Sequence, residues 1–264
     1  MNKTLITFGD SFSQYFWPMW PEIIGQCFQE VKNFGEPGCG NYYIFQQFQQ
    51  FSEVFSNVDN PTVIVQWTDP CRFDHFETRR YNWLMKGEAT ADYFFKHKKF
   101  YQFNSEELTV CKQLSYMVSV ANFLNLLGID WYYIFLNKAS FVHKYNFPGN
   151  NKCSVAQTIF HLQHKLLQFK DRIIDANALR EHNTKMEMPI RKISFNNTPY
   201  YVEEHPTPIF TYYFIKEVMI PKIKTLNLDI MHEYSKKIED IIESSIKDDI
   251  YMLNTDHQIM MGKR

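Results

Sequence analysis

The stretch TLITFGDSFS, residues 4–13, decides the fold. Its first five residues are apolar or β-prone and predict a short strand that ends at Gly9-Asp10-Ser11. The segment from Trp20 to Phe28 carries apolar residues at helical spacing, with Pro21 in its first turn. Strand, polar turn and helix in this order predict the first half of a βαβ unit, with Ser11 at the carboxyl end of the strand.

The same alternation continues along the chain. Further strands are expected at Glu30 to Phe34, Thr62 to Trp67 and Ile129 to Leu136. Further helices are expected at Asn41 to about Phe55, Glu106 to Leu127, Ser154 to Phe169 and Ile209 to Ile220. Because the run TVIVQW is apolar almost throughout, it predicts a central strand that is buried on both faces. The pattern predicts an α/β fold with a parallel sheet covered by helices on both sides.

The length of 264 residues and the hydrophobic content of 45% favour a single domain, residues 1–264. The segment from about 71 to 104 is rich in aromatic and charged residues without clean periodicity, which predicts an inserted surface segment. A charged amphipathic helix is expected at about 231–246, with an apolar stripe that contains Ile238, Ile241, Ile242 and Ile246. Packing of this stripe on the domain is the favoured expectation, and pairing with another chain is the alternative.

Composition excludes several function classes. A formal net charge of −1 provides no bulk field for nucleic acid, so none is expected as a partner. The longest apolar runs, such as Trp131 to Leu136, are too short to span a bilayer, which needs about 20 residues. The first residues lack a secretory pattern, and the five cysteines are scattered and odd in number. These features favour free thiols and a cytoplasmic location.

Two distant residues carry the candidate chemistry. A serine at a strand-to-helix turn presents its hydroxyl at the edge where parallel sheets place their active sites, which suits Ser11 as a nucleophile. By itself, a Gly-Asp-Ser tripeptide is common, and an ordinary polar turn in which Asp10 caps the chain is the favoured interpretation. A serine nucleophile needs a base, and His205 in the segment EEHPTP, just before a predicted helix, is the best placed histidine.

Together, FGDSFS and EEHPTP resemble the SGNH/GDSL hydrolase family, whose serine and histidine occupy these places. The resemblance implies a flavodoxin-like three-layer α/β/α sandwich, an ester or O-acetyl substrate and no cofactor. It also implies that a glycine after the second strand donates its N–H to the oxyanion. In NFGEPGCGN this donor is expected to be Gly38, with Gly40 as the alternative, because backbone can approach an intermediate closely only where no Cβ intervenes.

The sequence departs from the family pattern at two places. Where the family has an asparagine after the third strand, this chain has Thr68, whose hydroxyl is a less fixed oxyanion donor than an amide. The acid three residues before the histidine is replaced by valine, so Glu203 is the expected third member of the triad, and an aspartate from elsewhere or the lack of an acid is the alternative. Arg72 could pair with an anionic substrate group or with an internal acid. Asn41 is expected to cap a helix or, as the alternative, to contact the substrate.

The resulting hypothesis is a serine esterase that removes small O-acyl groups from a carbohydrate or a similar small ester. An O-acyltransferase on the same fold, or a binding protein that has lost useful catalysis, remains open at this point. Cys39 and Cys71 fall near the expected site, where packing is the favoured role and a catalytic thiol the alternative. Residues and composition do not indicate the oligomeric state.

Overall fold

The computed structural model describes residues 4–14, 18–68, 74–77, 82–85, 106–135, 154–176, 192–195, 198–201, 208–223 and 226–248. The strands of these ranges are β1 (Thr4–Phe8), β2 (Glu30–Asn33), β3 (Pro61–Trp67), β4 (His75–Glu77), β5 (Asn82–Met85), β6 (Asp130–Phe135), β7 (Ile173–Asp175), β8 (Lys192–Phe195) and β9 (Thr198–Tyr201). The helices are α1 (Trp20–Gly25), α2 (Asn41–Phe51), α5 (Glu106–Leu126), α7 (Ser154–Leu167), α9 (Pro208–Phe214) and α10 (Leu228–Asp248). Short 3₁₀ turns follow α2 (Ser52–Asn57) and precede β7 (Lys170–Arg172), and a π-helical turn (Ile215–Met219) continues α9.

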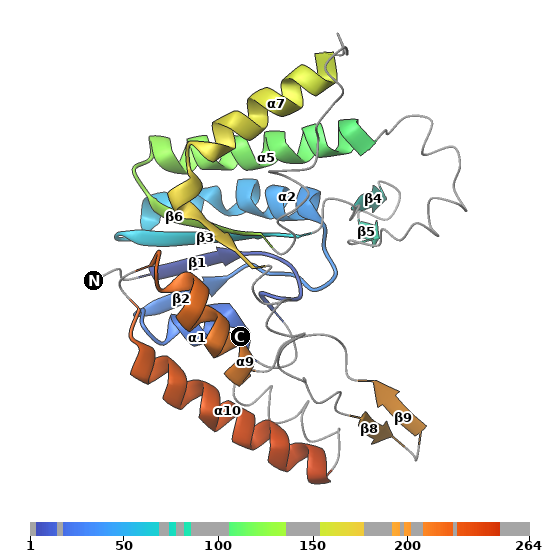
Figure 1. Cartoon of the computed structure of the whole chain (residues 1–264), viewed down its shortest axis with the longest axis vertical. Coiled ribbons are helices and arrows are strands. Elements are labelled where there is room, and N and C mark those ends of the chain that lie inside the picture. Colours follow the sequence, from blue (N-terminus) through green and yellow to red (C-terminus); the bar gives the residue numbers. More distant parts are fainter. Residues whose placement is uncertain are drawn as a thin grey trace.

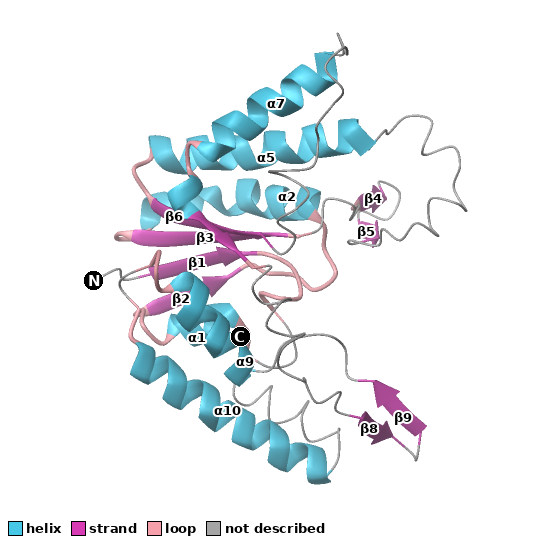
Figure 2. Ribbon diagram, in the orientation of Figure 1, coloured by secondary structure: helices cyan, strands magenta, loops and turns pink. Residues whose placement is uncertain are grey.

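Five strands form one parallel sheet in the order β2-β1-β3-β6-β7. Helices α2, α5 and α7 lie on one side of this sheet, and α1, α9 and α10 lie on the other (Figures 1 and 2). This strand order is that of the flavodoxin-like doubly wound folds. The predicted three-layer α/β sandwich with a central parallel sheet is therefore confirmed.

Two apolar clusters fill the spaces between the layers. Successive residues of β1 and β3 point to opposite faces, so Phe8 and Val65 belong to the cluster beneath α2 and α5, whereas Leu5 and Ile64 belong to the cluster beneath α1 and α9. Strand β3 is buried at all its positions after Pro61. The prediction that TVIVQW forms a central strand is confirmed.

Several short elements were missed by the sequence patterns. Strand β7 has three residues, too few to show a period of two, and its pairing with β6 defines it. The segment expected to be irregular contains the antiparallel pair β4 and β5, and a second antiparallel pair, β8 and β9, precedes α9. Helix α2 ends at Phe51 rather than near Phe55, and the chain continues as a 3₁₀ turn.

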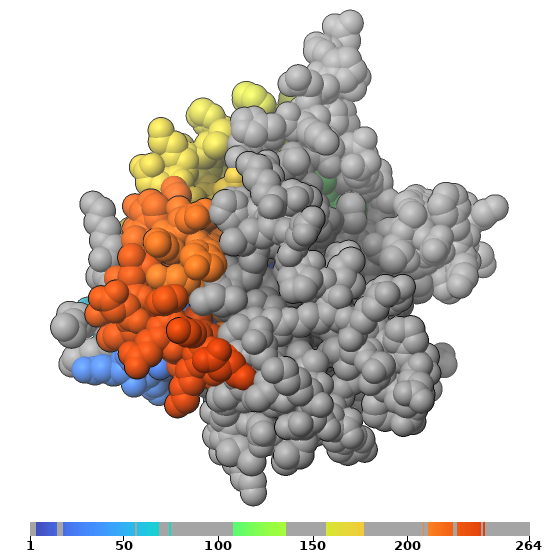
Figure 3. Space-filling view, turned by 60° about the horizontal axis from the view of Figure 1, so that its bottom comes forward, coloured from blue at the N-terminus to red at the C-terminus, as the bar shows by residue number. Residues whose placement is uncertain are grey.

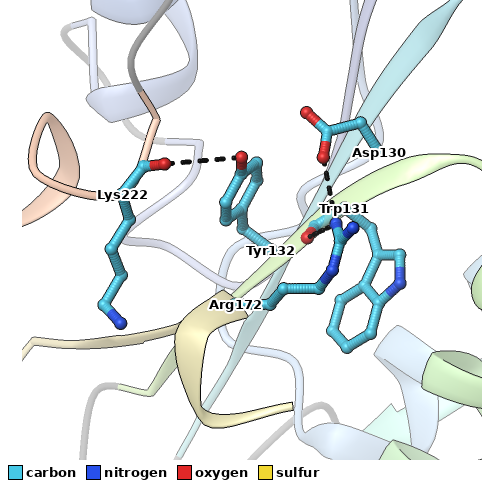
Figure 4. A network of polar contacts seen from close by, with 5 residues as sticks. All are labelled: Asp130, Trp131, Tyr132, Arg172 and Lys222. Carbon is cyan, nitrogen blue, oxygen red and sulfur yellow. Dashed lines mark hydrogen bonds and ion pairs between the residues drawn. The ribbon is translucent and has the colours of Figure 1, made fainter.

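A polar network joins β6 to β7 at the amino edge of the sheet (Figure 4). Arg172 donates to the Asp130 carboxylate at 2.9 Å and to the Trp131 carbonyl at 3.0 Å, and its guanidinium lies 5.4 Å from the Trp131 ring centre. The hydroxyl of Tyr132 reaches the carbonyl of Lys222 at 3.5 Å. These contacts hold the edge opposite to the one where Ser11 lies.

Helix α10 covers α9 and α1, and α9 and α10 form adjoining orange and red surfaces in Figure 3. Met231, Ser235 and Ile238 are buried at helical spacing on its inner face. Of the predicted stripe, Ile238 is thus buried against the domain, whereas the side chains of Ile241, Ile242 and Ile246 lie outside the described part. Within the described residues, no helix has the length and apolar character that crossing a membrane requires.

Candidate active site

The candidate site lies at the carboxyl edge of the sheet, where β1 and β3 are neighbours. The connections from these two strands lead to opposite faces of the sheet, which makes their ends the topological switch point of the fold, where α/β proteins bind ligands. Ser11 follows β1, Thr68 follows β3, and the loop that contains Gly38 follows β2. The fold therefore brings three of the predicted site residues to one edge.

Ser11 lies in a tight turn built on Asp10. The Asp10 carbonyl accepts the N–H groups of Ser13 at 2.9 Å and Gln14 at 3.1 Å, and its carboxylate accepts the Phe12 N–H at 2.9 Å. Ser13 is fully buried, and its hydroxyl donates to the Asp10 carbonyl at 2.7 Å. Ser11 is 7% exposed, which makes it the more accessible of the two serines in the turn.

A buried side-chain relay supports this turn from below. The Trp20 indole donates to the amide oxygen of Gln66 at 2.6 Å, and the Gln66 amide nitrogen donates to the Asp10 carboxylate at 2.5 Å. Asp10 and Gln66 are fully buried. A Cβ on Gly9 would come within 2.5 Å of the Ser13 hydroxyl oxygen and 3.0 Å of the Gln66 Cβ, so only glycine fits beside the relay.

Asn33, the last residue of β2, connects the first loop to the second. Its amide nitrogen donates to the Ser13 carbonyl at 2.7 Å and to the Glu22 carboxylate at 2.9 Å. Its amide oxygen accepts the Thr7 hydroxyl at 2.8 Å and the Gly35 N–H at 3.0 Å. One amide thus satisfies four partners and fixes the start of the Gly38 loop relative to the Ser11 turn.

The Gly38 loop presents one unengaged donor. Glu36 donates its N–H to the Gly9 carbonyl at 3.0 Å, and Cys39 donates its N–H to the Glu36 carbonyl at 3.4 Å. Pro37 has no N–H. Gly38 is exposed with φ of 76°, a left-handed conformation that favours glycine, and its N–H makes no hydrogen bond within the described part of the chain. An exposed N–H without a described partner is one feature that an oxyanion donor requires.

Gly40, the alternative donor, is engaged elsewhere. Its N–H donates to one carboxylate oxygen of Asp74 at 2.7 Å, and the Tyr43 N–H donates to the other at 2.8 Å. This contact argues against Gly40 as the oxyanion donor, because its hydrogen is already bound. Burial, together with the charges of Glu36, Cys39 and Asp74, raises the pKa of Tyr43 to about 12.

Asn41 ties the second loop to the third. Its amide oxygen accepts the Thr68 N–H at 2.8 Å, and its amide nitrogen donates to the Thr68 carbonyl at 3.0 Å and to the Gln113 amide oxygen. Asn41 is the first residue of α2 and fully buried, and the N-cap is Gly40. The predicted cap role is therefore wrong, because Gly40 is the N-cap, and the substrate contact stays a prediction. The side chain instead positions Thr68.

Thr68 itself is only 2% exposed. Its backbone is held on both sides by Asn41, whereas its hydroxyl makes no hydrogen bond to any other residue that the structure describes. Among the described residues, no other group therefore engages this hydroxyl at the carboxyl end of β3. Cys39, also near this edge, is buried with its thiol directed at the Gly9 carbonyl at 3.4 Å, a contact that fits a packing role.

His205, Glu203, Arg72 and Cys71 lie outside the described residues, so their predicted roles stay predictions. The chain is described up to Tyr201 at the end of β9 and again from Pro208 at the start of α9. Helix α9 packs against α1, the helix that follows the Ser11 turn. Within the described ranges, no group of three or more histidine, cysteine or carboxylate side chains could hold a metal ion.

Gln66, Asp74 and Gln113 are the site-forming residues that sequence reasoning missed. Gln66 entered the sequence patterns only as part of the run TVIVQW, although a polar residue in an otherwise apolar central strand is a signal for a buried partner. Asp74 and Gln113 contact partners at least 31 residues away in sequence, and no local pattern marks them.

No protein-family model matches the chain, and no curated protein sequence matches it significantly. Solved structures resemble it at low identity. LAE5, an α/β hydrolase enzyme from the metagenome of Lake Arreo, is 11% identical with a TM-score of 0.43, over 85% of this chain and 96% of that one. A lipolytic protein of the G-D-S-L family from Veillonella parvula is 14% identical with a TM-score of 0.37, over 81% and 97%. Axe2, an acetylxylan esterase from Geobacillus stearothermophilus, is 10% identical with a TM-score of 0.40, over 84% and 94%.

Proposed function

We propose that this chain is a serine-dependent ester hydrolase of the SGNH/GDSL type. The observation that supports the proposal most directly lies at the switch point of the sheet. There, the Ser11 turn adjoins a loop in which the Gly38 N–H alone, among the described donors from Gly35 to Gly40, has no hydrogen-bond partner. A nucleophile and an unengaged backbone donor at one edge are two of the parts that acyl transfer requires, and the proposed base, His205, is the third.

In the proposed mechanism, the Ser11 hydroxyl attacks the ester carbonyl carbon while His205 accepts its proton. Glu203 holds the imidazole in the correct tautomer and stabilises the imidazolium that forms. The N–H groups of Ser11 and Gly38 bind the oxyanion, and the Thr68 hydroxyl adds a third donor. His205 then protonates the departing alcohol, and a water molecule, activated by the same histidine, releases the acyl group from Ser11.

The proposed substrate is a small O-acyl group, such as acetyl, on a carbohydrate or a similar small alcohol. The exposed fraction of Ser11, 7%, favours a narrow entrance that admits a small acyl group more readily than a long chain. A donor set with a rotatable threonine hydroxyl in place of a fixed amide favours modest turnover, because one lost oxyanion donor typically costs about 10²–10³ in kcat.

Covalent labelling with a fluorophosphonate, followed by intact-mass measurement, tests the proposal. We expect one adduct per chain on the wild type and none on Ser11→Ala, whereas Ser13→Ala, a change two residues away in the same turn, should label. His205→Ala should abolish labelling, and His164→Ala, on the exposed surface of α7, should not affect it. A folded wild type that neither labels nor hydrolyses p-nitrophenyl acetate would favour a binding protein on the same fold.

A second assay separates a hydrolase from an acyltransferase. Acetyl release from the acyl-enzyme is measured in water alone and with an added sugar alcohol. A rate of acetyl release in water alone that equals the rate with the sugar alcohol supports hydrolysis. Release that depends on the added hydroxyl would assign the chain to the O-acyltransferases instead.

A further inference from the structure

Helix α2 lacks a side-chain cap of its own, and Asp74 supplies one from a distance. The N-cap residue, Gly40, has no side chain, so the first N–H groups of the helix would otherwise be unpaired. One oxygen of Asp74 accepts the Gly40 N–H at 2.7 Å and the other accepts the Tyr43 N–H at 2.8 Å. In an ordinary capping box, the residues that cap the helix are near neighbours in sequence. Here, Asp74 is 34 residues from Gly40 and 31 residues from Tyr43.

A carboxylate at this position suits the local electrostatics. The partial positive charge at the amino end of an eleven-residue helix stabilises an anion, and both oxygens of Asp74 face backbone N–H groups. The same carboxylate contributes, after burial, to the raised pKa of the Tyr43 hydroxyl. Asp74 therefore lies against the first turn of α2 as a charged group.

This contact determines how the Gly38 loop is held. The loop is anchored before Gly38 by the bond from Glu36 to the Gly9 carbonyl, and after Gly38 by the bond from Gly40 to Asp74. Between the two anchors, Gly38 keeps a left-handed φ of 76° with its N–H unengaged. Without the second anchor, a glycine with such freedom could turn its N–H away, and the Gly40 N–H would be released at the same edge.

We propose that Asp74 is a positioning residue of the active site, which fixes the Gly38 loop so that the Gly38 N–H, and not that of Gly40, faces the oxyanion. This role rests on the proposed function of the chain as a serine hydrolase. Asp74 does not touch the reacting atoms and acts through the first turn of α2. Asp74 thereby joins the segment that follows β3 to the oxyanion loop, in addition to the contact between Asn41 and Thr68.

The test compares Asp74→Ala and Asp74→Asn with a matched cap removal elsewhere. Asn227 caps α10 in the same way, because its side-chain oxygen accepts the N–H groups of Asp229 at 3.0 Å and Ile230 at 3.4 Å. Asn227 also contacts Cys27, which precedes β2 at the amino edge of the sheet, away from the Gly38 loop. Asn227→Ala therefore removes a helix cap without touching the candidate site.

Four quantities are measured for each variant: the urea midpoint, the second-order rate constant of Ser11 phosphonylation, and kcat and KM for p-nitrophenyl acetate. We expect similar midpoint shifts for Asp74→Ala and Asn227→Ala, since both remove one cap. Only Asp74→Ala should lower the labelling rate constant and kcat, by about tenfold to a hundredfold. Its KM should change less than about threefold, because oxyanion donors act in the transition state. Asp74→Asn keeps one oxygen acceptor and should fall between wild type and alanine.

The outcomes separate the inference from the proposed function. A wild type that does not label refutes the serine hydrolase itself. A wild type that labels, together with an Asp74→Ala variant that is folded and reacts equally fast, refutes only the role of Asp74. Equal loss of activity in Asn227→Ala would assign the effect to stability, and a change confined to KM would assign it to substrate binding; either result overturns the inference.

Discussion

Replacement of Gln66 by leucine tests the relay beneath the Ser11 turn. Leucine is close to glutamine in volume, so the packing against Gly9 and Trp20 is kept, but both hydrogen bonds are lost. The Trp20 indole N–H loses its only described acceptor, at 2.6 Å, and the Asp10 carboxylate loses a donor at 2.5 Å while it keeps the Phe12 N–H at 2.9 Å.

The magnitude follows from the burial of these groups. An unsatisfied buried donor costs about 1–3 kcal/mol, and a charged acceptor that loses a partner costs more. All three side chains are at most 3% exposed, so water cannot replace the missing partner. We therefore expect the free energy of unfolding to fall by ~3–5 kcal/mol, a large share of the ~5–15 kcal/mol of an ordinary domain.

Urea unfolding followed by circular dichroism at pH 7 measures this loss. Gln26→Leu is the matched control, because Gln26 is exposed and its side chain makes one described hydrogen bond, to the Glu22 carbonyl at 3.0 Å. Its effect should stay within about 0.5 kcal/mol. A Gln66→Leu variant that is as stable as the wild type would refute the reasoning, since the relay would then contribute nothing net.

Gln66→Glu gives an independent check through pH. The introduced carboxyl would face the Asp10 carboxylate in a buried site and retain its proton in the folded state, so its folded pKa lies above the unfolded value of about 4.3. Stability is then fully present below that value and is lost as the pH rises through the folded pKa. The difference from wild type should therefore grow from pH 4 to pH 8, and a constant difference would contradict the relay geometry.

Three further predictions concern stability. Burial raises the pKa of Tyr43 to about 12, so the contribution of its hydroxyl to stability is present below the usual pKa of about 10 and is lost as the pH rises toward 12. In urea titrations between pH 9 and 11, Tyr43→Phe should therefore lose less stability than the wild type. Parallel curves for the two proteins would contradict this. Ser235 is fully buried, and its hydroxyl lacks a hydrogen-bond partner within the described residues. Ser235→Ala should therefore raise the unfolding free energy by about 1 kcal/mol in thermal melts. A lower melting temperature would indicate a hydrogen-bond partner outside the described residues. Arg172→Ala should cost about 1 kcal/mol, and the cost should shrink in 1 M NaCl because the pair with Asp130 is partly exposed; a salt-independent loss would point to packing on Trp131 alone.

The sequence by itself determined the order and type of the main elements. Local periodicity predicts strands β1, β3 and β6 and helices α1, α5 and α7. Each of these helices buries one apolar stripe, and each of these strands buries two faces. The Ser11 turn was also predictable, since Gly9, Asp10 and Ser11 act within a few residues of one another. The same holds for Gly38, whose left-handed backbone conformation is a property of glycine itself.

The tertiary structure alone decided how the loops of the site are held. Gln66 and Asp10 are 56 residues apart, Asn41 and Gln113 are 72 apart, and Asp74 reaches Gly40 across 34 residues. The role of a polar side chain, as a cap, a surface residue or a ligand, depends on partners that the local sequence does not show, which is why Asn41 was wrongly predicted to cap the helix. Its true partner, Thr68, comes beside it only when β3 takes its place next to β1 in the sheet, because sheet order and not local periodicity brings the carboxyl ends of the strands together.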